Sequence, residues 1–189
     1  MKWLGLGLTV GALGGCLIPQ DEEYLSELPV RLNHPLRIVE QHAKPSNRII
    51  RGFGTPELCE LEFSVPVEDL DLADTLVAYW FVDYDPNQPR GADSVVNILP
   101  DKGAIDAVRD EFAVFRARYN SADIGRLNTP GDHVVEVVVT DTALLAGREP
   151  QGKSSINLED GTVYEDRGYT ASYAWFVKTE AGGTGVNCQ

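Results

Sequence analysis

The sequence is short of positive charge. It contains 16 Lys and Arg residues against 29 Asp and Glu residues, and its formal net charge at pH 7 is −13. Recognition of nucleic-acid phosphates needs clustered Lys and Arg side chains, and an anionic lipid surface repels so acidic a chain. The composition therefore argues against nucleic-acid binding and against attachment to a membrane through surface charge. A solubilising surface for an exported protein explains the excess of carboxylates.

Motifs of common catalytic and metal sites are also missing. The sequence has no Gly-rich phosphate-binding loop, no Gly-x-Ser-x-Gly and no His-Glu-x-x-His pattern. Its three histidines, His34, His42 and His133, are scattered, and no catalytic triad is evident along the chain. Cysteine is scarce as well, and without a Cys-x-x-Cys pair no zinc site is expected. We predict no catalytic residue, no metal ligand and no cofactor.

The amino-terminal stretch gives the clearest signal. Lys2 precedes an uncharged run, residues 4–13, which leads into Leu-Gly-Gly-Cys, ending at Cys16. A run of about ten residues is too short to cross a bilayer and has the length of a secretory signal's apolar region. Leu-Gly-Gly-Cys resembles the lipobox of bacterial lipoproteins. The resemblance implies cleavage before Cys16 and acylation of that residue, and two or three acyl chains give stable anchoring. The alternatives are an ordinary signal peptide with an incidental Cys, and a buried helix.

These features divide the chain into three parts. Residues 1–15 are predicted as the lipoprotein signal peptide, residues 16–29 as the acylated Cys and an acidic tether, and residues 30–189 as one domain. If Cys16 is acylated, Cys59 and Cys188 remain as a pair in a chain bound for an oxidising compartment, which predicts a disulfide. Two separate buried thiols are the alternative.

Alternation of apolar and polar residues predicts strands along the domain. Residues 58–65 place Cys59 on an apolar face, and residues 75–84 place Trp80 on one. The apolar spacing within residues 102–119 also fits a helix face, but we assign its second half to a strand. The closing strand, residues 171–179, should pair with the valine-rich strand, residues 134–139, as a hairpin with an enlarged loop. The remaining predicted strands are residues 36–39, 94–99, 111–119, 134–139 and 171–179.

One segment carries a resemblance to a fold. Residues 127–141, LNTPGDHVVEVVVTD, resemble the Leu-x-x-Pro-Gly-x-His-x-Val-x-Val-x-Val-x-Asp signature of Ig-like and PKD-like extracellular modules. The match is confined to this segment; it specifies a fold element rather than a function, and it makes His133 a structural strand residue. With a Cys and a Trp on buried faces, it implies an all-β chain: a single antiparallel Ig-like β-sandwich of about seven strands. A lipocalin-like barrel is the alternative.

One acidic constellation begins like a calcium loop. Asp83-x-Asp85-x-Asn87 has the opening spacing, and Asp93 lies nearby, but the Gly and the bidentate Glu of an EF-hand loop are absent. The carboxylates of residues 68–74 could lie close to it. A calcium site and a solvated strand end, in which the aspartates accept turn hydrogen bonds, are both compatible with the sequence, and we favour the second.

Together these features predict a lipid-anchored, non-catalytic binding or assembly module of the bacterial cell envelope. Leu17, rather than Asp, follows Cys16, which under the enterobacterial sorting rule favours the outer membrane. The contact surface is expected in the long polar loop of residues 142–170, and the partner is expected to be an envelope protein. The alternatives are an envelope hydrolase that uses scattered carboxylates and a sensor lipoprotein that binds calcium or a small ligand.

Overall fold

The computed structural model describes residues 32–100, 103, 105–109, 111–119, 126–145, 148–158, 161–180 and 188. Within them the regular structure is β-sheet, apart from one short 3-10 helix, η1 (Glu40–His42), so the predicted all-β class is confirmed. The strands are β1 (Arg37–Ile38), β2 (Ile49–Phe53), β3 (Glu60–Val65), β4 (Val67–Glu68), β5 (Leu76–Val82), β6 (Ser94–Ile98), β7 (Ala113–Arg118), β8 (Gly131–Thr140), β9 (Ser154–Asn157), β10 (Val163–Asp166) and β11 (Thr170–Thr179).

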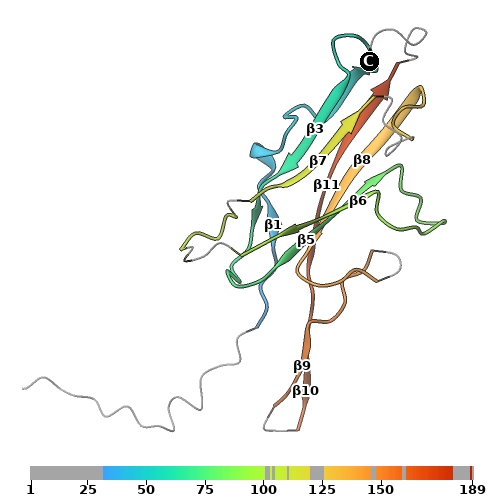
Figure 1. Ribbon diagram of the computed structural model, residues 1–189. Coiled ribbons are helices and arrows are strands. Elements are labelled where there is room, and N and C mark those ends of the chain that lie inside the picture. Colours follow the sequence, from blue (N-terminus) through green and yellow to red (C-terminus); the bar gives the residue numbers. More distant parts are fainter. Residues whose placement is uncertain are drawn as a thin grey trace, which may run out of the picture. The chain divides into compact units, whose positions relative to one another are not determined.

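The main sheet has five strands in the order β2-β11-β8-β5-β6 (Figure 1). The predicted pairing of the closing strand with the valine-rich strand is confirmed, because β11 and β8 are antiparallel along their whole length. The prediction of a wholly antiparallel sheet is wrong, because β2 runs parallel to β11. No hairpin joins these two strands, so no turn sets their direction or register, and the sequence carries no local signal of the pairing.

Aromatic side chains attach the sheet of β3 and β7 to one face of the main sheet. Phe63 of β3 contacts Trp175 of β11 with ring centroids 5.1 Å apart, and Phe115 of β7 stacks on Trp80 of β5 at 5.3 Å. Both Trp side chains and Phe63 are fully buried. The Trp175 indole donates to the Pro45 carbonyl oxygen at 2.9 Å, which satisfies its only polar atom. The predicted apolar faces of residues 58–65 and 75–84 therefore meet in one core.

The strand pattern differs from the prediction in number. The described part of the chain contains eleven strands, whereas about seven were expected. Residues 113–118 form a strand, as assigned, and not the helix face that the apolar spacing also allowed. The additional strands are β2, the two-residue β4 and the pair β9–β10, whereas β1 lies within the predicted strand of residues 36–39. These are short or interrupted by Gly, and so their alternation is too brief to stand out in the sequence.

The described residues from 32 onward belong to one compact unit. The predicted signal peptide, Cys16 and the tether lie outside the described residues, so these assignments stay predictions. In the part of the chain that is described, no helix has both the length and the apolar character that crossing a membrane requires.

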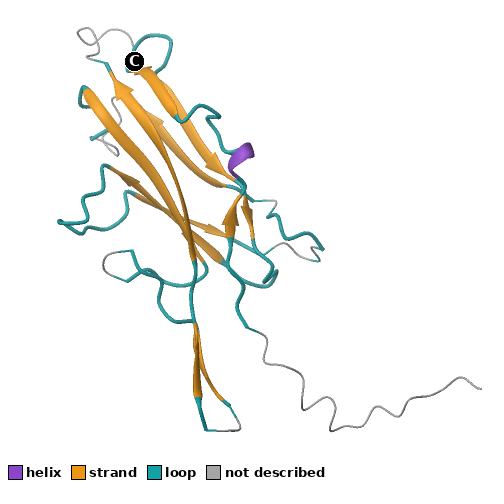
Figure 2. Cartoon of the chain, turned by 180° about the vertical axis from the view of Figure 1, so that it is seen from behind, coloured by secondary structure: helices purple, strands orange, loops and turns teal. Residues whose placement is uncertain are grey.

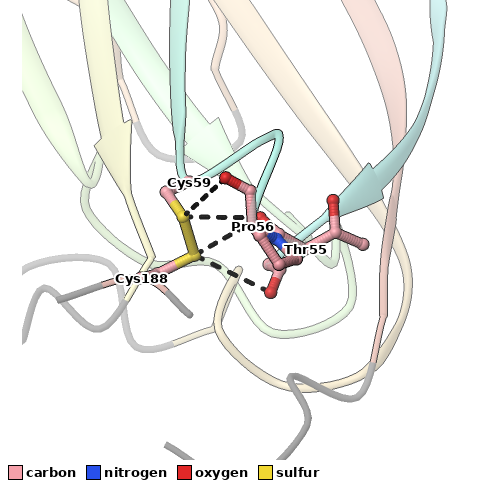
Figure 3. Close-up of a disulfide and its surroundings, with 5 residues drawn as sticks. Thr55, Pro56, Cys59 and Cys188 are labelled. Atoms are coloured by element: carbon pink, nitrogen blue, oxygen red, sulfur yellow. Dashed lines mark hydrogen bonds between the residues drawn. A yellow bond between two sulfur atoms is a disulfide. The ribbon is translucent and has the colours of Figure 1, made fainter. Parts of the chain in front are cut away.

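The predicted disulfide joins Cys59 and Cys188 (Figure 3). The two sulfur atoms lie 3.4 and 3.5 Å from the Thr55 carbonyl oxygen, along the dashed lines of Figure 3. A disulfide sulfur carries no proton, so we treat these as packing contacts. The bond ties residue 188 to the turn between β2 and β3.

We expect loss of this disulfide to destabilise the fold. A loop that spans a sequence separation of 129 residues contributes roughly 4–5 kcal/mol in the chain-entropy account. Urea unfolding of the Cys59→Ser/Cys188→Ser variant should therefore have a much lower midpoint than the oxidised wild type. The reduced wild type is the control and should unfold with the variant. An unchanged midpoint would show that the loop closure does not stabilise the protein.

Candidate functional site

The segment predicted as the contact loop, residues 142–170, contains a β-hairpin. β9 and β10 pair antiparallel in a register that sets Tyr164 opposite Ile156. Gly161 in the connecting turn has a φ of 82°, a left-handed conformation that glycine adopts without steric cost. Figures 1 and 2 show the hairpin apart from the other sheets, beyond the end at which β11 begins. An element with regular geometry therefore replaces the irregular loop that was expected.

Apolar side chains are exposed on this hairpin. Val163 is 60% exposed, Leu158 39% and Tyr164 38%. An isolated two-stranded hairpin is marginally stable in water, and apolar side chains that cluster on a surface mark sites of contact with another molecule. The hairpin thus exposes Val163 and Tyr164 on opposite faces of β10, and Leu158 just after β9.

The base of the hairpin is fixed by a network around Lys153 and Asn33. The Lys153 ammonium donates to Asn33 Oδ1 at 2.8 Å and to the Asp74 carboxylate. The Asn33 amide in turn donates to Asp141 Oδ2 at 2.5 Å and to the Arg167 carbonyl oxygen at 2.8 Å. One amide therefore joins the segment ahead of β1 to the end of β8 and to the residue that follows β10.

A glycine lets the two sides of this base close on each other. A Cβ atom at Gly168 would collide with the Thr142 hydroxyl and with the Gln151 carbonyl oxygen. The Tyr169 amide, one residue later, donates to Asp141 Oδ1 at 2.8 Å. The chain can therefore pass from the hairpin into β11 at this close approach only if residue 168 has no side chain.

A second polar group, around Arg109, orders the acidic loop that contains Asp74. Arg109 is 1% exposed and donates to Asp69 Oδ2 at 2.7 Å and to the Asp71 carbonyl oxygen at 2.9 Å. The Asp71 carboxylate accepts from the His34 backbone amide at 2.7 Å and lies 3.2 Å from the His34 ring. The acidic loop of residues 68–74 is therefore an ordered, internally bonded segment.

Charges in this cluster shift each other's pKa values. Burial alone would lower the pKa of Lys153, but the hydrogen bond and charge of Asp74, with the charges of Asp141 and Asp71, raise it. For Asp71, burial is outweighed by hydrogen bonds from His34 and by nearby positive charge, so its pKa is lowered. Burial raises the pKa of Asp69. Lys153 thus stays charged among the carboxylates. Its ammonium group neutralises them, as a bound metal cation would in an acidic cluster.

The calcium-like constellation is divided among separate local contacts. Asp85 accepts from the Asn87 backbone amide at 2.8 Å in a turn, and Asp93 pairs with Arg90 at 2.8 Å. Among the described residues no three His, Cys, Asp or Glu side chains are arranged to hold a metal ion. The idea that residues 68–74 lie close to Asp83 is wrong, because the two groups lie at opposite ends of β5, whose seven residues span about 20 Å.

The structure places His133 within β8, where its side chain is 8% exposed. Its Nδ1 lies 2.7 Å from Asp83 Oδ2, and its Nε2 lies 2.7 Å from the Thr129 carbonyl oxygen. The Asp83 Oδ1 atom also accepts from the Val134 amide at 2.8 Å. The ring and the carboxylate therefore connect the end of β5 to the start of β8, the structural role that the resemblance implies.

The hydrolase hypothesis asks for carboxylates with raised pKa values that a substrate can reach. Asp69 has such a pKa, but it is 1% exposed and bonded to Arg109. A groove of about 650 Å³ over β2, β11 and β8 is lined by Asp132 and Glu180 among mostly apolar and basic side chains. In the described part of the chain, therefore, Asp69, whose pKa is raised, does not line the groove that a substrate could reach.

Sequence reasoning found the segment that carries the site but not the residues that hold it. Asn33, Lys153 and Asp141 lie far apart along the chain, and none belongs to a motif, so no local pattern could connect them. The hairpin itself had a signal. The dipeptide Asp160-Gly161 is a typical turn sequence, and short apolar stretches flank it on both sides.

We expect the Asp71 carboxylate to make stability depend on acid pH. Its pKa is lower in the folded chain than the ordinary value, so its contribution is present above the unfolded pKa of about 3.9 and is lost as pH falls through the folded pKa. Asp71→Asn should lose about 1–2 kcal/mol at pH 6 and show a shallower fall between about pH 5 and pH 2. Urea unfolding across this range measures both effects. Glu57→Gln, at an exposed position without an ion pair in the described chain, should retain the wild-type profile. Parallel profiles for wild type and Asp71→Asn would contradict this assignment.

Comparison with known proteins adds no relative. No family model, no curated protein and no solved structure matches the chain. Its function must therefore be inferred from its own residues.

Proposed function

We propose that this chain is a lipid-anchored, non-catalytic binding module of the bacterial cell envelope, and that the β9–β10 hairpin is the element that contacts its partner. The anchor is the acylated Cys16, the domain has an Ig-like sandwich architecture, and the partner is another envelope protein. The membrane we favour is the outer membrane.

The Ig-like part of the proposal is supported by strand order. In such domains the strands C, F and G are neighbours in one sheet, strands B and E lie in the other, and a buried Trp lies on strand C. Here β5, β8 and β11 are neighbours, β3 pairs with β7, and Trp80 on β5 is fully buried. The disulfide departs from the pattern of antibody domains, because it joins the start of β3 to residue 188 rather than strands B and F.

The envelope location is supported by the cysteines. Disulfides persist in oxidising compartments and are rare in the bacterial cytosol, and the Cys59–Cys188 bond leaves Cys16 as the remaining cysteine of the chain. An acidic surface with a net charge of −13 does not bind an anionic lipid layer. A covalent lipid on Cys16 would supply the membrane attachment that this surface cannot.

The exposed apolar surface of the hairpin is the observation that carries the binding role. Val163 and Tyr164 are exposed on an element whose base is held by Lys153 and Asn33. A rigid base lowers the entropy that a partner must overcome when it orders the element. Exposed apolar side chains on a hairpin that is held in this way suit recognition of a partner.

Acylation of Cys16 is the first expected outcome. Cells grown with an alkyne-bearing palmitate should incorporate it into the wild-type chain, and Cys16→Ser should abolish the label and release the protein from the membrane fraction. The Cys59→Ser/Cys188→Ser variant is the control and should keep the label. A labelled Cys16→Ser variant, or a wild type with an intact signal peptide and no lipid mass, would refute the anchor.

Contact through the hairpin is the second expected outcome. A photo-crosslinking residue at Val163, 60% exposed, should yield one adduct with an envelope protein in living cells, and Tyr164→Ser should lower the yield roughly tenfold or more. The matched control is the same crosslinker at Leu99, which is 57% exposed and lies just after β6. Equal adducts at both positions, or none at Val163, would show that the hairpin is not the contact element.

A further inference from the structure

The outer face of the main sheet carries an uncovered apolar row. Ile49 of β2, Phe176 of β11 and Val134 of β8 are direct cross-strand neighbours. Their side chains point away from the core, and they are 61%, 54% and 37% exposed. The strands β8 and β11 run side by side in Figure 1. Three large apolar side chains in register on adjacent strands form one continuous surface rather than scattered exposed residues.

A charged row lies directly beside the apolar row. Arg51, Lys178 and Asp132 are the next outward neighbours on the same three strands. Arg51 and Lys178 are like charges placed opposite each other, an arrangement that destabilises a sheet. All six side chains line the groove of about 650 Å³ on this face.

None of the three side chains forms a salt bridge in the described part of the chain, although Asp132 is the direct cross-strand neighbour of Lys178. The salt bridges there involve other residues, and most of the other arginines have an acidic partner. In a chain with a net charge of −13, two adjacent unpaired cations are a local exception. An acidic group brought to Arg51 by a second molecule would relieve the repulsion between Arg51 and Lys178.

We propose that this face binds a second copy of the same chain, about a two-fold axis parallel to β11. Such an axis lays β11 over its copy and exchanges β2 with β8, while each row stays opposite the same row. Phe176 then meets Phe176 of the other copy, and Ile49 meets Val134. Arg51 meets Asp132 twice, once on each side of the axis, because the interface is isologous. Lys178, which lies on β11 between them, faces Lys178 of the other copy.

The order of charges across the row favours this occupant over an unrelated acidic partner. The cation Arg51 and the anion Asp132 are the outer members of the row, equally placed on either side of β11. Exchange of β2 and β8 therefore makes the row complementary to itself at both ends. At the centre the two Lys178 residues face each other, each beside the Asp132 of its own copy. A purely acidic partner would face Asp132 with a like charge. The apolar row supplies the buried centre that such an interface needs.

This inference is independent of the proposed function, because the hairpin and the outer face share no residue.

A residue on the two-fold axis faces itself in the other copy. Phe176→Cys in the full chain should therefore form an intermolecular disulfide in membranes under mild oxidation, which a non-reducing gel shows as a band of doubled mass. Val95→Cys is the control, because Val95 is 54% exposed on β6 of the same sheet, three strands from β11.

Charge reversal tests the pairing within the Phe176→Cys background. Arg51→Asp should lower the crosslinked fraction roughly tenfold or more, because it sets like charges opposite each other at both ends of the row. Arg51→Asp combined with Asp132→Arg should restore the crosslink. No crosslink at Phe176→Cys, an equal crosslink at Val95→Cys, or no rescue by the double reversal would each overturn the proposal. Crosslinking with rescue would establish both the second copy and the axis.

Discussion

The contact between four aromatic side chains is the interaction on which the rest of this structure depends. The sheet of β3 and β7 has only two strands, and such a sheet is not stable alone in water. Phe63 and Phe115 attach it to Trp80 and Trp175, with centroid separations of 5.1 to 6.4 Å between the two sheets. Fully burying one such side chain contributes about 1.5–3 kcal/mol, and edge and offset contacts between rings add to this. Every other feature, including the hairpin base, is positioned by the main sheet that this cluster stabilises.

Scarcity of positive charge gives each basic residue a large local effect. Lys153 is the only cation bonded to the Asn33 amide and the Asp74 carboxylate in the described chain, and it also lies in the field of Asp71 and Asp141. In a balanced protein another lysine could compensate for its loss. Here the carboxylates of Asp74, Asp71 and Asp141 would lose the cation that they share, which would weaken the contact between the segments that carry them. The surface charge that keeps the chain soluble thus makes its ordered polar cluster depend on few residues.

The sequence predicted those parts of the fold that leave a local signal. Alternation located β3, β5, β8 and β11, and it placed Trp80 on the core side, because a half-buried strand must alternate. It could not predict that β2 would lie beside β11, since about 120 residues separate them and no turn fixes their direction. For the candidate site the sequence indicated the segment through its length and polarity. The hydrogen bonds of Asn33 and Lys153 depend on tertiary proximity, which no spacing in the sequence encodes.

The parallel pairing of β2 with β11 determines how the domain would respond to a pulling force. Phe176 donates its amide hydrogen to the Arg48 carbonyl oxygen at one end of this pair, and Glu180 donates to that of Phe53 at the other. With the Cys59–Cys188 disulfide reduced, tension applied to the chain ahead of β2 and beyond β11 would act along both strands in opposite directions. The hydrogen bonds between them would then be loaded together, in shear, whereas a terminal hairpin would open one bond at a time. A reduced chain held at its amino-terminal side would therefore resist extension at this edge before any other strand of the main sheet bore the load. In the oxidised chain the disulfide would carry the tension from residue 188 to Cys59 and bypass β11.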